Sequence, residues 1–454
     1  MLSKATCTCK CCYQQSRFVY LGKNLIIKLA QQQNNMSNIP RPLFRSFSRL
    51  GRHWLKRSRP NHIEALKDSS FEFTVASYNV LADHLLQEHP HLYYGQNGDE
   101  PWVYDWNYRK CNLMEEFRCS NPDILCLQEV QEDHFYNWFN PRLKEEGYTG
   151  VYKKRTGDKH DGCATFFKRD RFALESYQLI DFRRSNCSLL DRDNVAILLF
   201  LQPLSTKKLK NRSPICVSNT HLLFNKKRGD IKLAQLAYLF AEIDRLAGNK
   251  STTSCEYPPI IMCGDFNSTP FSPLYNLVTT GKLRYSGLSR TLVSGQLKEK
   301  PRDSWSGNFG TSIFPKDLGL SNYCKWKSIG NESIRGTSNE VQVFNVETNE
   351  YQNCFTSSEN DLPGYLKHNL ALQSCYQHYS VDGTPEVTTC HDRAAVTVDY
   401  IFYSKPSGLY EREQLWLSGV LDLLGEHEVK NLGSLPNKYI SSDHLLLMAS
   451  FVMH

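Results

Sequence analysis

The stretch "YPPIIMCGDFNSTPFSP" (residues 257–273) joins an apolar run to a group of polar residues. The apolar residues 260–263 are bounded by proline on one side and by glycine on the other, which is typical of a short buried strand. Asp265 and Asn267 follow at the carboxyl end of this strand. Because Asp and Asn also suit turns, this segment alone fits a loop as well as a functional site.

Polar residues also lie at or near the end of five other apolar segments. They are Asn79 in "VASYNVLA", Glu129 in "ILCLQEVQ", His221 in "VSNTHLL", Asp399 in "VTVDYIFY", and Asp443 with His444 in "SSDHLLLMASF". Any one of them can be a cap, a turn residue or a hydrogen-bonded polar group. Six such segments together predict that the strand ends meet in one cleft, where carboxylates repel each other unless a cation lies among them.

The types of side chain in this set indicate which cation the cleft would bind. Asp and Glu carboxylates and an Asn carbonyl are hard oxygen ligands, and none of the six segments supplies cysteines at metal-binding spacing. This favours Mg²⁺ or Mn²⁺ over Zn²⁺. His221 and His444 can donate hydrogen bonds to phosphate oxygens, and Asp265 can act as a base for water. The residues therefore predict metal-assisted hydrolysis of a phosphate ester.

From residue 71 onward, predicted strands alternate with predicted helices. Strands are expected at 71–82, 121–130, 162–169, 194–204, 214–223, 260–263 and 394–404, and helices at 108–120, 134–147 and 228–246. In the last of these helices, Ile231, Leu236 and Leu239 recur near helical spacing. The alternation predicts one large α/β domain over residues 71–454. Because no apolar run approaches about eighteen residues, we expect no transmembrane helix and no membrane partner.

The positive charge of the chain is concentrated in its first 60 residues. They contain twelve Lys or Arg and no Asp or Glu, which leaves 42 basic and 47 acidic residues in the other 394. The globular part is therefore mildly acidic, unlike most proteins that coat DNA. We expect residues 1–70 to form a disordered basic tail. Its lack of acidic residues is also typical of a mitochondrial transit peptide, and this alternative stays open.

Residues 281–369 differ in composition from the rest of the predicted domain. Ser, Asn, Gly and Lys dominate this stretch, and its apolar residues are isolated from one another. A long segment of this kind is typical of a flexible insertion on the surface and not of an independent domain.

The distribution of the cysteines indicates whether the protein resides in a reducing or an oxidising compartment. Four of the sixteen cysteines lie in "CTCKCC" within the tail. No second pair of ligands lies at the spacing that zinc sites require. Several of the others lie in apolar runs, where a free thiol packs as a small hydrophobic group. A large chain without a secretory signal rarely depends on disulfides, so we expect a reducing compartment. The cytoplasm and nucleus are the expected location, and the tail leaves the mitochondrion open.

The ordered motifs "YNVLA", "LQEV", "NTHL", "GDFNSTP", "VDYIF" and "SSDH" resemble the exonuclease–endonuclease–phosphatase superfamily, which has the DNase I-like fold. "GCATFFK", "FNSTPFSPLY" and "SSDHLLL" are similar to the branch that contains nocturnin, the carbon catabolite repressor deadenylases and the Angel proteins. Residues 219–244 resemble the Angel proteins most. The resemblance spans about residues 71–454 and implies a two-sheet α/β sandwich flanked by helices.

The resemblance also implies a metal site. In that family, the residues that match Asn79 and Glu129 hold an essential Mg²⁺. Asp443 would contribute to the metal site directly or through water.

Catalytic roles follow from the same motifs. Asp265 would orient or deprotonate the attacking water, while Asn267 and His221 would contact the phosphate. Asp399 would pair with His444, fixing its tautomer and favouring its charged form beside the negative charge that develops on the phosphate.

The resemblance implies an enzyme that acts on RNA 3′ ends. Our first hypothesis is a Mg²⁺-dependent phosphatase that hydrolyses 2′,3′-cyclic phosphate, and the alternative is a 3′-exoribonuclease of the poly(A) deadenylase type. A non-catalytic RNA-binding adaptor is a third possibility, but it predicts the loss of a ligand or of the base, and none is lost. No leucine-rich repeat precedes residue 71, so stable docking into a deadenylase complex is not expected.

Overall fold

The computed structural model of the chain describes most of residues 70–453 and one short segment before them. The described residues are 47–58, 70–93, 100–204, 213–248, 257–300, 307–327, 340–345, 350–355, 363–380, 382–391, 394–405, 414–433 and 435–453. Within these ranges, no helix is both long enough and apolar enough to cross a membrane.

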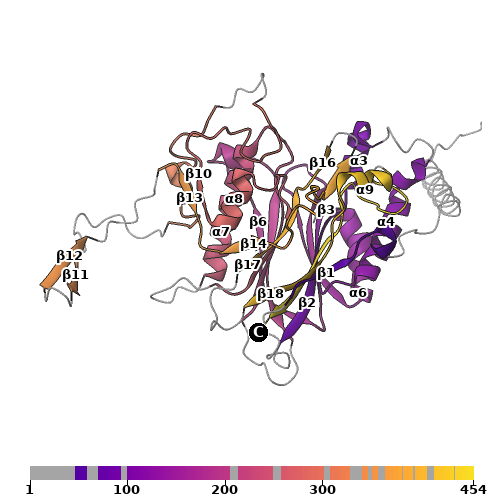
Figure 1. Ribbon diagram of the computed structural model, residues 1–454, viewed down its shortest axis with the longest axis horizontal. Helices are drawn as coiled ribbons and strands as arrows, with labels where there is room; N and C mark the ends of the chain where they lie inside the picture. Colours follow the sequence, from indigo (N-terminus) through magenta and orange to yellow (C-terminus); the bar gives the residue numbers. More distant parts are fainter. Residues whose placement is uncertain are drawn as a thin grey trace, which may run out of the picture.

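Two β-sheets form the centre of the molecule (Figure 1). The first contains seven strands in the order β1 (Trp54–Lys56), β18 (Leu415–Leu421), β19 (Leu447–Met453), β2 (Phe71–Asn79), β3 (Ile124–Gln131), β5 (Asp161–Lys168) and β4 (Tyr148–Lys154). The second contains six in the order β14 (Leu372–Ser374), β17 (Asp399–Ser404), β9 (Ile260–Asp265), β8 (Ile215–His221), β7 (Val195–Pro203) and β6 (Phe172–Asp181). The predicted two-sheet α/β sandwich is confirmed.

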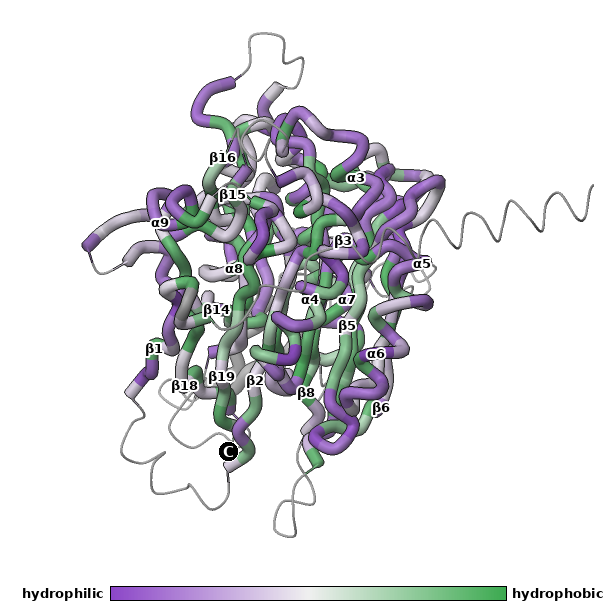
Figure 2. Tube along the Cα trace, turned by 90° about the vertical axis from the view of Figure 1, so that its right-hand side faces the viewer, coloured by the Kyte–Doolittle hydropathy of each residue, from purple (hydrophilic) through white to green (hydrophobic). Residues whose placement is uncertain are grey.

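The inner faces of the two sheets share one hydrophobic core. Phe73 and Val75 of β2 belong to the same buried cluster as Val217 of β8 and Ile261 of β9. Figure 2 shows hydrophobic residues concentrated along the strands, with the hydrophilic residues mostly in the outer segments. Packing two sheets face to face buries the alternate side chains that point inward.

Helices cover the outer faces of both sheets. Helices α4 (Trp106–Ser120) and α6 (Asn140–Glu145) lie on the side of the first sheet, and α7 (Gly229–Ala247) and α8 (Pro273–Thr280) on the side of the second (Figure 1). Both faces of the second sheet are covered, so every residue of its strands β8 and β9 is buried. The predicted helix at 228–246 is confirmed as α7.

The remaining elements are short. The helices are α3 (Asp83–Glu88), α5 (Glu132–His134), α9 (Glu426–Asn431), the π-helix η5 (Phe135–Phe139) and the 3₁₀ turns η1 (Phe47–Leu50), η3 (Pro90–Leu92), η4 (Pro101–Tyr104), η6 (Ser188–Leu190) and η7 (Lys316–Leu318). Three two-stranded sheets pair β10 (Lys282–Arg284) with β13 (Tyr365–Lys367), β11 (Glu340–Asn345) with β12 (Glu350–Phe355), and β15 (Thr389–His391) with β16 (Ala394–Val396).

Each large sheet contains one parallel pair of strands at its centre. In the first sheet, β2 runs parallel to β3, with Asn79 opposite Gln128. In the second, β8 runs parallel to β9, with His221 opposite Asp265. Parallel strands end at the same edge of a sheet. Each parallel pair therefore brings the polar residues at the ends of its two strands to one edge of its sheet, Asn79 and Glu129 in the first sheet and His221 and Asp265 in the second.

Part of the predicted disordered tail is folded onto the first sheet. Residues 47–58 include β1, which pairs with β18 in an antiparallel register, Trp54 opposite Leu421. The buried guanidinium of Arg52 donates hydrogen bonds to the carbonyl oxygens of Asp422 and Leu446, both at 2.8 Å. These partners lie far away in the sequence, so local composition could not indicate them. The remainder of the predicted tail, residues 1–46 and 59–69, lies outside the described residues.

Part of the predicted insertion is also packed into the domain. Tyr285, Phe309, Ile313 and Leu320 are buried in the cluster that includes α7 and α8. Their isolated positions give no periodic signal in the sequence, yet all four belong to the same buried cluster as residues of α7 and α8. The description of a flexible surface insertion therefore does not fit residues 281–300 and 307–327. Other parts of the predicted insertion lie outside the described residues.

Candidate active site

The ends of β2, β3 and β9 meet through one side-chain amide. Nδ2 of Asn79 donates hydrogen bonds to Oε1 of Glu129 at 3.0 Å and to Oδ2 of Asp265 at 3.2 Å. Asn79 and Glu129 belong to the first sheet, whereas Asp265 belongs to the second. The two sheets therefore contribute to one polar site, as the strand-end pattern predicts.

Glu129 lies where β3 departs from regular pairing. The register of β3 against β5 shifts between Leu127 and Val130, and the φ angle of Glu129 is +58°. Left-handed backbone is unfavourable for such a side chain and persists only where the surroundings hold it. The backbone N–H of Ala82 donates to Oε2 of Glu129 at 3.0 Å, which fixes the carboxylate at the site.

The "GDFN" segment is at once a turn and part of the site. The backbone N–H of Asn267 donates to Oδ1 of Asp265 at 2.9 Å, and the φ angle of Asn267 is +48°. A Cβ atom at Gly264 would lie 2.0 Å from the carbonyl oxygen of Thr220, so only glycine allows β9 to lie this close to β8. This close approach places Oδ2 of Asp265 3.5 Å from Nε2 of His221.

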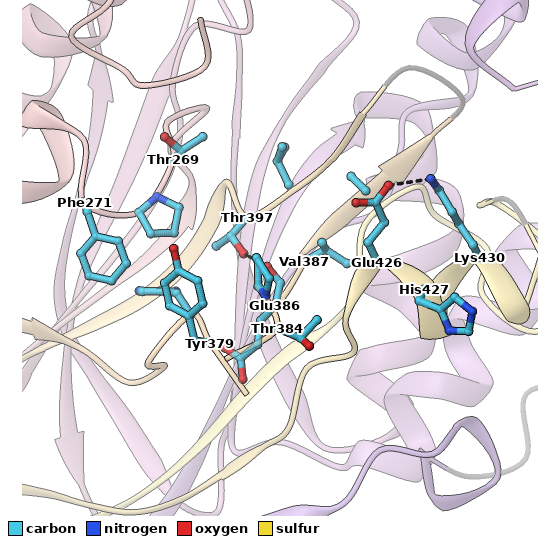
Figure 3. A pocket seen from close by; sticks show the side chains of 15 residues that line it. Thr269, Phe271, Tyr379, Thr384, Glu386, Val387, Thr397, Glu426, His427 and Lys430 are labelled. Atoms are coloured by element: carbon cyan, nitrogen blue, oxygen red, sulfur yellow. Dashed lines mark hydrogen bonds and ion pairs between the residues drawn. The ribbon is translucent and has the colours of Figure 1, made fainter. Parts of the chain in front are cut away.

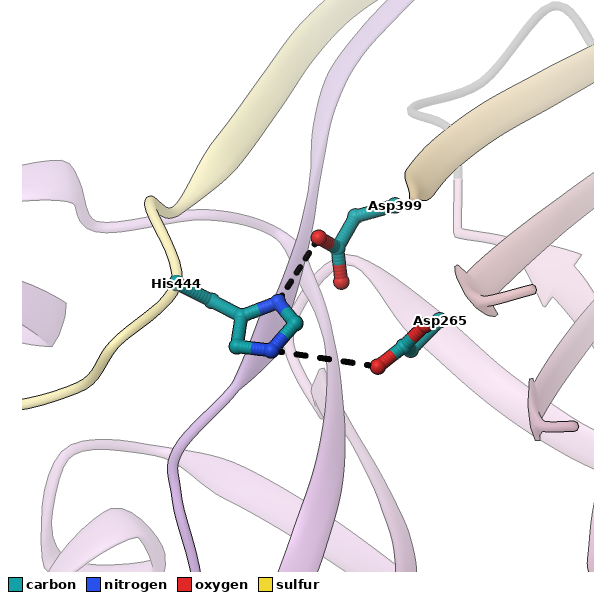
Figure 4. A group of neighbouring side chains, drawn as sticks. All are labelled: Asp265, Asp399 and His444. Carbon is teal, nitrogen blue, oxygen red and sulfur yellow. Dashed lines mark hydrogen bonds and ion pairs between the residues drawn. The ribbon is translucent and has the colours of Figure 1, made fainter. Parts of the chain in front are cut away.

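His444 lies between two carboxylates (Figure 4). Its Nδ1 is 2.8 Å from Oδ2 of Asp399, and its Nε2 is 3.9 Å from Oδ2 of Asp265. Burial alone would disfavour the charged ring, but Asp399 and then Asp443 raise the pKa of His444 well above its ordinary value. His444 is therefore a cation at neutral pH, with Nε2 directed towards Asp265.

The carboxylate of Asp399 is itself held in place. The hydroxyl of Thr388 donates to its Oδ2 at 2.6 Å, and its Oδ1 is buried without a hydrogen-bond partner in the described part of the chain. Asp399 thus has its charge directed at His444, which is the pairing that the motifs imply.

The pKa values of Asp265 and His221 are shifted towards the neutral forms of these groups, whereas the pKa of His444 is shifted towards its charged form. Burial, and next the negative charge of Asp399, raise the pKa of the Asp265 carboxyl to about 8. Burial, and next the positive charge of Arg155, lower the pKa of His221 to about 3. The His221 ring is therefore neutral and supplies one N–H donor without a charge. Its Nε2 lies 3.1 Å from Nδ2 of Asn267.

Asp443 completes the set of predicted residues. Tyr93 donates its hydroxyl to Oδ2 of Asp443 at 3.0 Å, and Oδ1 is 3.9 Å from Nε2 of His444. Oδ1 is buried and has no hydrogen-bond partner among the described residues. The segment that carries Asp443 is fixed to the first sheet because the hydroxyl of Ser442 donates to the carbonyl oxygen of Asn79 at 2.6 Å.

A cleft of about 240 Å³ opens over these groups. Six of the eight predicted residues line it: Glu129, His221, Asp265, Asn267, Asp443 and His444. Asn79 and Asp399 are buried directly behind them, in contact with Asp265 and His444. All eight predicted residues therefore lie in one place.

Two groups of side chains here could hold a cation. One consists of Asp265, Asp399 and His444, whose ligand atoms lie within 4.8 Å of one another. A charged His444 would repel a cation at that point. Glu129 and Asp443 line the same cleft, and Asn79 contacts Glu129 from behind it. Their oxygen atoms are hard ligands by type, and the unpartnered Oδ1 of Asp443 is available for coordination. This second group fits a divalent cation better.

Several contacts to the site were not predicted. The side chain of Lys232 is fully buried in α7, and its Nζ donates to the carbonyl oxygen of Asn267 at 2.8 Å and to the side chain of Gln296. Burial lowers the pKa of Lys232 to about 7. Gln296 belongs to the predicted insertion and also lines the cleft. Lys232 could have been singled out in the sequence because it is a lysine within an apolar helical stretch. The residues around Gln296 do not indicate that it lies at the site.

Arg155 was also missed. It lines the cleft and forms an ion pair with the buried carboxylate of Asp161. Nε2 of His84 lies 3.5 Å from the same oxygen of Asp161, Oδ1. Arg155 therefore places a fixed positive charge on the wall of the cleft.

Comparison with protein families gives one match over most of the chain. A model described as the endonuclease/exonuclease/phosphatase family matches residues 76–444. Protein angel homolog 2 of Mus musculus is 42% identical over 398 residues, which cover 85% of this chain and 70% of that protein. Carbon catabolite repressor protein 4 homolog 3 of Arabidopsis thaliana is 32% identical over 416 residues, which cover 89% and 80%.

Solved structures show the same relationship. A crystal structure of ANGEL2, described as a 2′,3′-cyclic phosphatase, in complex with adenosine-2′,3′-vanadate is similar with a TM-score of 0.71. The two sequences are 40% identical, and the similarity covers 88% of this chain and 98% of that one. The human nocturnin catalytic domain with bound sulfate shares the fold, with a TM-score of 0.51 and 23% identity over 89% of this chain and 99% of that one.

Proposed function

The chain belongs to the endonuclease/exonuclease/phosphatase family, as its motifs predict, and from this premise we propose that it hydrolyses 2′,3′-cyclic phosphate at the 3′ ends of RNA. The observation that carries this proposal is the arrangement at the cleft. A buried carboxylate, Asp265, and a charged histidine, His444, face each other at 3.9 Å in a chain that is 40% identical to ANGEL2. The chain is thus a phosphoric-ester hydrolase with a site suited to a ribose phosphate.

The donor set suits a divalent cation, and we propose Mg²⁺, with Mn²⁺ as a substitute. Asn79 and Glu129 would hold it, and Asp443 would bind it directly or through water. When bound, the cation draws electron density from the phosphate and neutralises the charge that develops there. It would also lower the pKa of Asp265, which burial and Asp399 raise.

Asp265 is placed to take the proton of the attacking water. One of its oxygens is held by the N–H of Asn267, and the other faces His221 and His444. Attack on phosphorus breaks one of the two bonds from phosphorus to the ribose oxygens, and that oxygen must receive a proton. A second hydrolysis at the same site releases phosphate and leaves both ribose hydroxyls free.

His444 supplies positive charge and a proton on the other side of the reacting group. Its Nδ1 is engaged by Asp399, so the N–H at Nε2 is the one left to reach a phosphate or leaving ribose oxygen. Asn267 and His221 would contact a phosphate oxygen. The amide of Asn267 donates to the carbonyl oxygen of Leu222 and lies 3.1 Å from Nε2 of His221, so it would exchange this second contact for one to phosphate. Such a hydrogen bond stabilises the transition state more than the substrate if it forms fully only there.

The same chemistry also fits a 3′-exoribonuclease, and the similarity to carbon catabolite repressor protein 4 homolog 3 favours this as the second candidate. Both reactions bring a terminal ribose and a phosphate to one cation. A non-catalytic adaptor is disfavoured because none of the eight residues is replaced, and they converge at one cleft.

Initial rates on matched RNAs distinguish the two activities. We would compare one sequence ending in 2′,3′-cyclic phosphate, in 3′-phosphate or in an A-tail, each with Mg²⁺ and with EDTA. We expect the cyclic end to react fastest, with no activity in EDTA. Stepwise shortening of the A-tail at a higher rate would instead establish the exoribonuclease.

A further inference from the structure

A second, larger hollow adjoins the active-site cleft. Figure 3 shows the side chains that line it. This groove has a volume of about 630 Å³ and shares the side chain of Val396 with the cleft as a common wall. The loop that carries Asp265 and Asn267 continues without a break into Thr269 and Phe271, which line the groove. The groove is therefore continuous with the catalytic loop.

An exposed aromatic pair forms one end of the groove. The rings of Phe271 and Tyr379 lie 5.9 Å apart between centroids with an interplanar angle of 21°, and they are 53% and 47% exposed. The two rings lie together on the left of Figure 3, away from Glu426 and Lys430. Flat apolar rings presented to solvent in this way offer a stacking surface.

The backbone beneath this pair adopts unfavourable angles. The φ angle is +60° at Phe271 and +69° at His378, the residue before Tyr379. A bulky residue is rarely left-handed, and such angles persist at sites where the surrounding structure imposes them. Both loops that present the pair therefore carry a strained residue.

His378 and Tyr275 support the pair from below. His378 is 3% exposed, and its Nε2 lies 3.1 Å from the hydroxyl of Tyr275. Its ring meets Phe271 edge to face, with centroids 5.9 Å apart. Burial lowers the pKa of His378 to about 4, so this support is uncharged at neutral pH. The ring of Phe271 is thus packed against a buried, uncharged aromatic neighbour.

The charges of the groove disfavour a phosphate. Lys430 is the only Lys or Arg among its described lining residues, and it already pairs with Glu426. Glu386 adds a second carboxylate, whose Oε2 is buried without a hydrogen-bond partner in the described ranges. A ligand that brings a flat ring and hydrogen-bond donors suits this lining better than an anion does.

We propose that the groove binds unpaired nucleobases of the RNA strand, on the 5′ side of the reacting end. This inference rests on the proposed function, because a polymeric substrate must continue outwards from the cleft. Bases stack on aromatic side chains with little regard to sequence, which suits an enzyme that acts on an end group. The sugar–phosphate backbone would face solvent, away from the carboxylates.

Two substrates test this directly. We would measure kcat/KM for Phe271→Ala and Tyr379→Ala on a single-stranded RNA with a 2′,3′-cyclic phosphate end and on a nucleoside 2′,3′-cyclic monophosphate. Stacking on an aromatic residue predicts a loss of roughly tenfold on the RNA for each variant. The mononucleotide fills only the cleft, so its rate should stay within about twofold. Phe271→Trp should retain activity on the RNA.

Tyr177→Ala is the matched control, because Tyr177 is a 55% exposed aromatic on β6 that lines neither the cleft nor the groove. It should leave both rates unchanged. No loss on RNA, or an equal loss on both substrates, would overturn the proposal. A groove for a protein partner would give no loss on either substrate.

Binding separates failure of this proposal from failure of the proposed function. If the unmodified protein hydrolyses neither substrate, the proposed function fails, and the groove is judged from the Kd of the same RNA in EDTA. Abasic nucleotides placed singly along the RNA should weaken binding at one or two positions. At those positions Phe271→Ala should cause no further loss, whereas fully additive losses would contradict stacking in the groove.

Discussion

Asp265→Asn should abolish turnover and at the same time stabilise the folded protein. The substitution keeps the size of the side chain. It also keeps one oxygen, which can accept the hydrogen bond that the N–H of Asn267 donates to Oδ1 of Asp265 at 2.9 Å. It removes the base, whose assistance is typically worth roughly 10²–10⁴-fold in rate. It also removes a carboxyl group that the fold disfavours in its charged form.

The gain in stability follows from the pKa of Asp265. The fold raises it from 3.8 to about 8, so the charged carboxylate costs folding free energy at any pH above the unfolded value. At pH 7 the cost is at most about 4 kcal/mol in the absence of a cation, because one pKa unit corresponds to about 1.4 kcal/mol. Asn carries no such cost, but its amide nitrogen takes the place of Oδ2 and loses the hydrogen bond from Nδ2 of Asn79, which reduces the net gain. The advantage of the variant should be small near pH 5 and should grow up to about pH 8.

Thermal unfolding in EDTA, at several pH values, measures this difference. We expect a higher Tm for Asp265→Asn at pH 7 to 8, together with activity at least a hundredfold below that of the parent protein. A variant that misfolds would lose both activity and stability. A folded variant with activity within about tenfold of the parent would refute the assignment of Asp265 as the base.

Three further substitutions test separate parts of the site. Glu129→Gln removes a charged metal ligand, so turnover should fall by on the order of a thousandfold, with a higher Mg²⁺ requirement in a metal titration. Asp399→Asn removes a charge that, together with Asp443, raises the pKa of His444. The variant should therefore lose kcat at alkaline pH and recover part of it on acidification. A flat kcat–pH profile would contradict this. Lys232→Met leaves the carbonyl oxygen of Asn267 without its donor, which we expect to lower kcat by roughly tenfold with little change in KM, as steady-state kinetics would show.

The sequence predicts the site better than it predicts the surroundings. Asp265 and Asn267 can be identified as candidate site residues because the apolar run before them and the glycine at 264 mark the end of a strand. Their turn geometry is real, since Asn267 donates to Asp265, and yet the same turn presents both to the cleft. The segment is therefore a turn whose two polar residues also line the cleft, and their catalytic roles stay a prediction.

Contacts between residues far apart in the sequence could not be predicted from local patterns. β1 pairs with β18, more than 350 residues away, and its three residues are exposed, so no hydrophobic period marks it. Tyr285 and Phe309 are single apolar residues in a polar stretch, and they are buried against each other in a cluster that also contains residues of α7 and α8. The contact of Gln296 with Lys232 likewise depends on how the chain returns to α7.

The mass of the RNA product tests the central claim most directly. A single-stranded RNA ending in 2′,3′-cyclic phosphate would be incubated with the purified protein and Mg²⁺, alongside Asp265→Asn, and its intact mass recorded over time. The site described here predicts loss of phosphate with every nucleotide retained, and no change with the variant. Loss of whole nucleotides from the 3′ end, or an unchanged cyclic end with the parent protein, would contradict it.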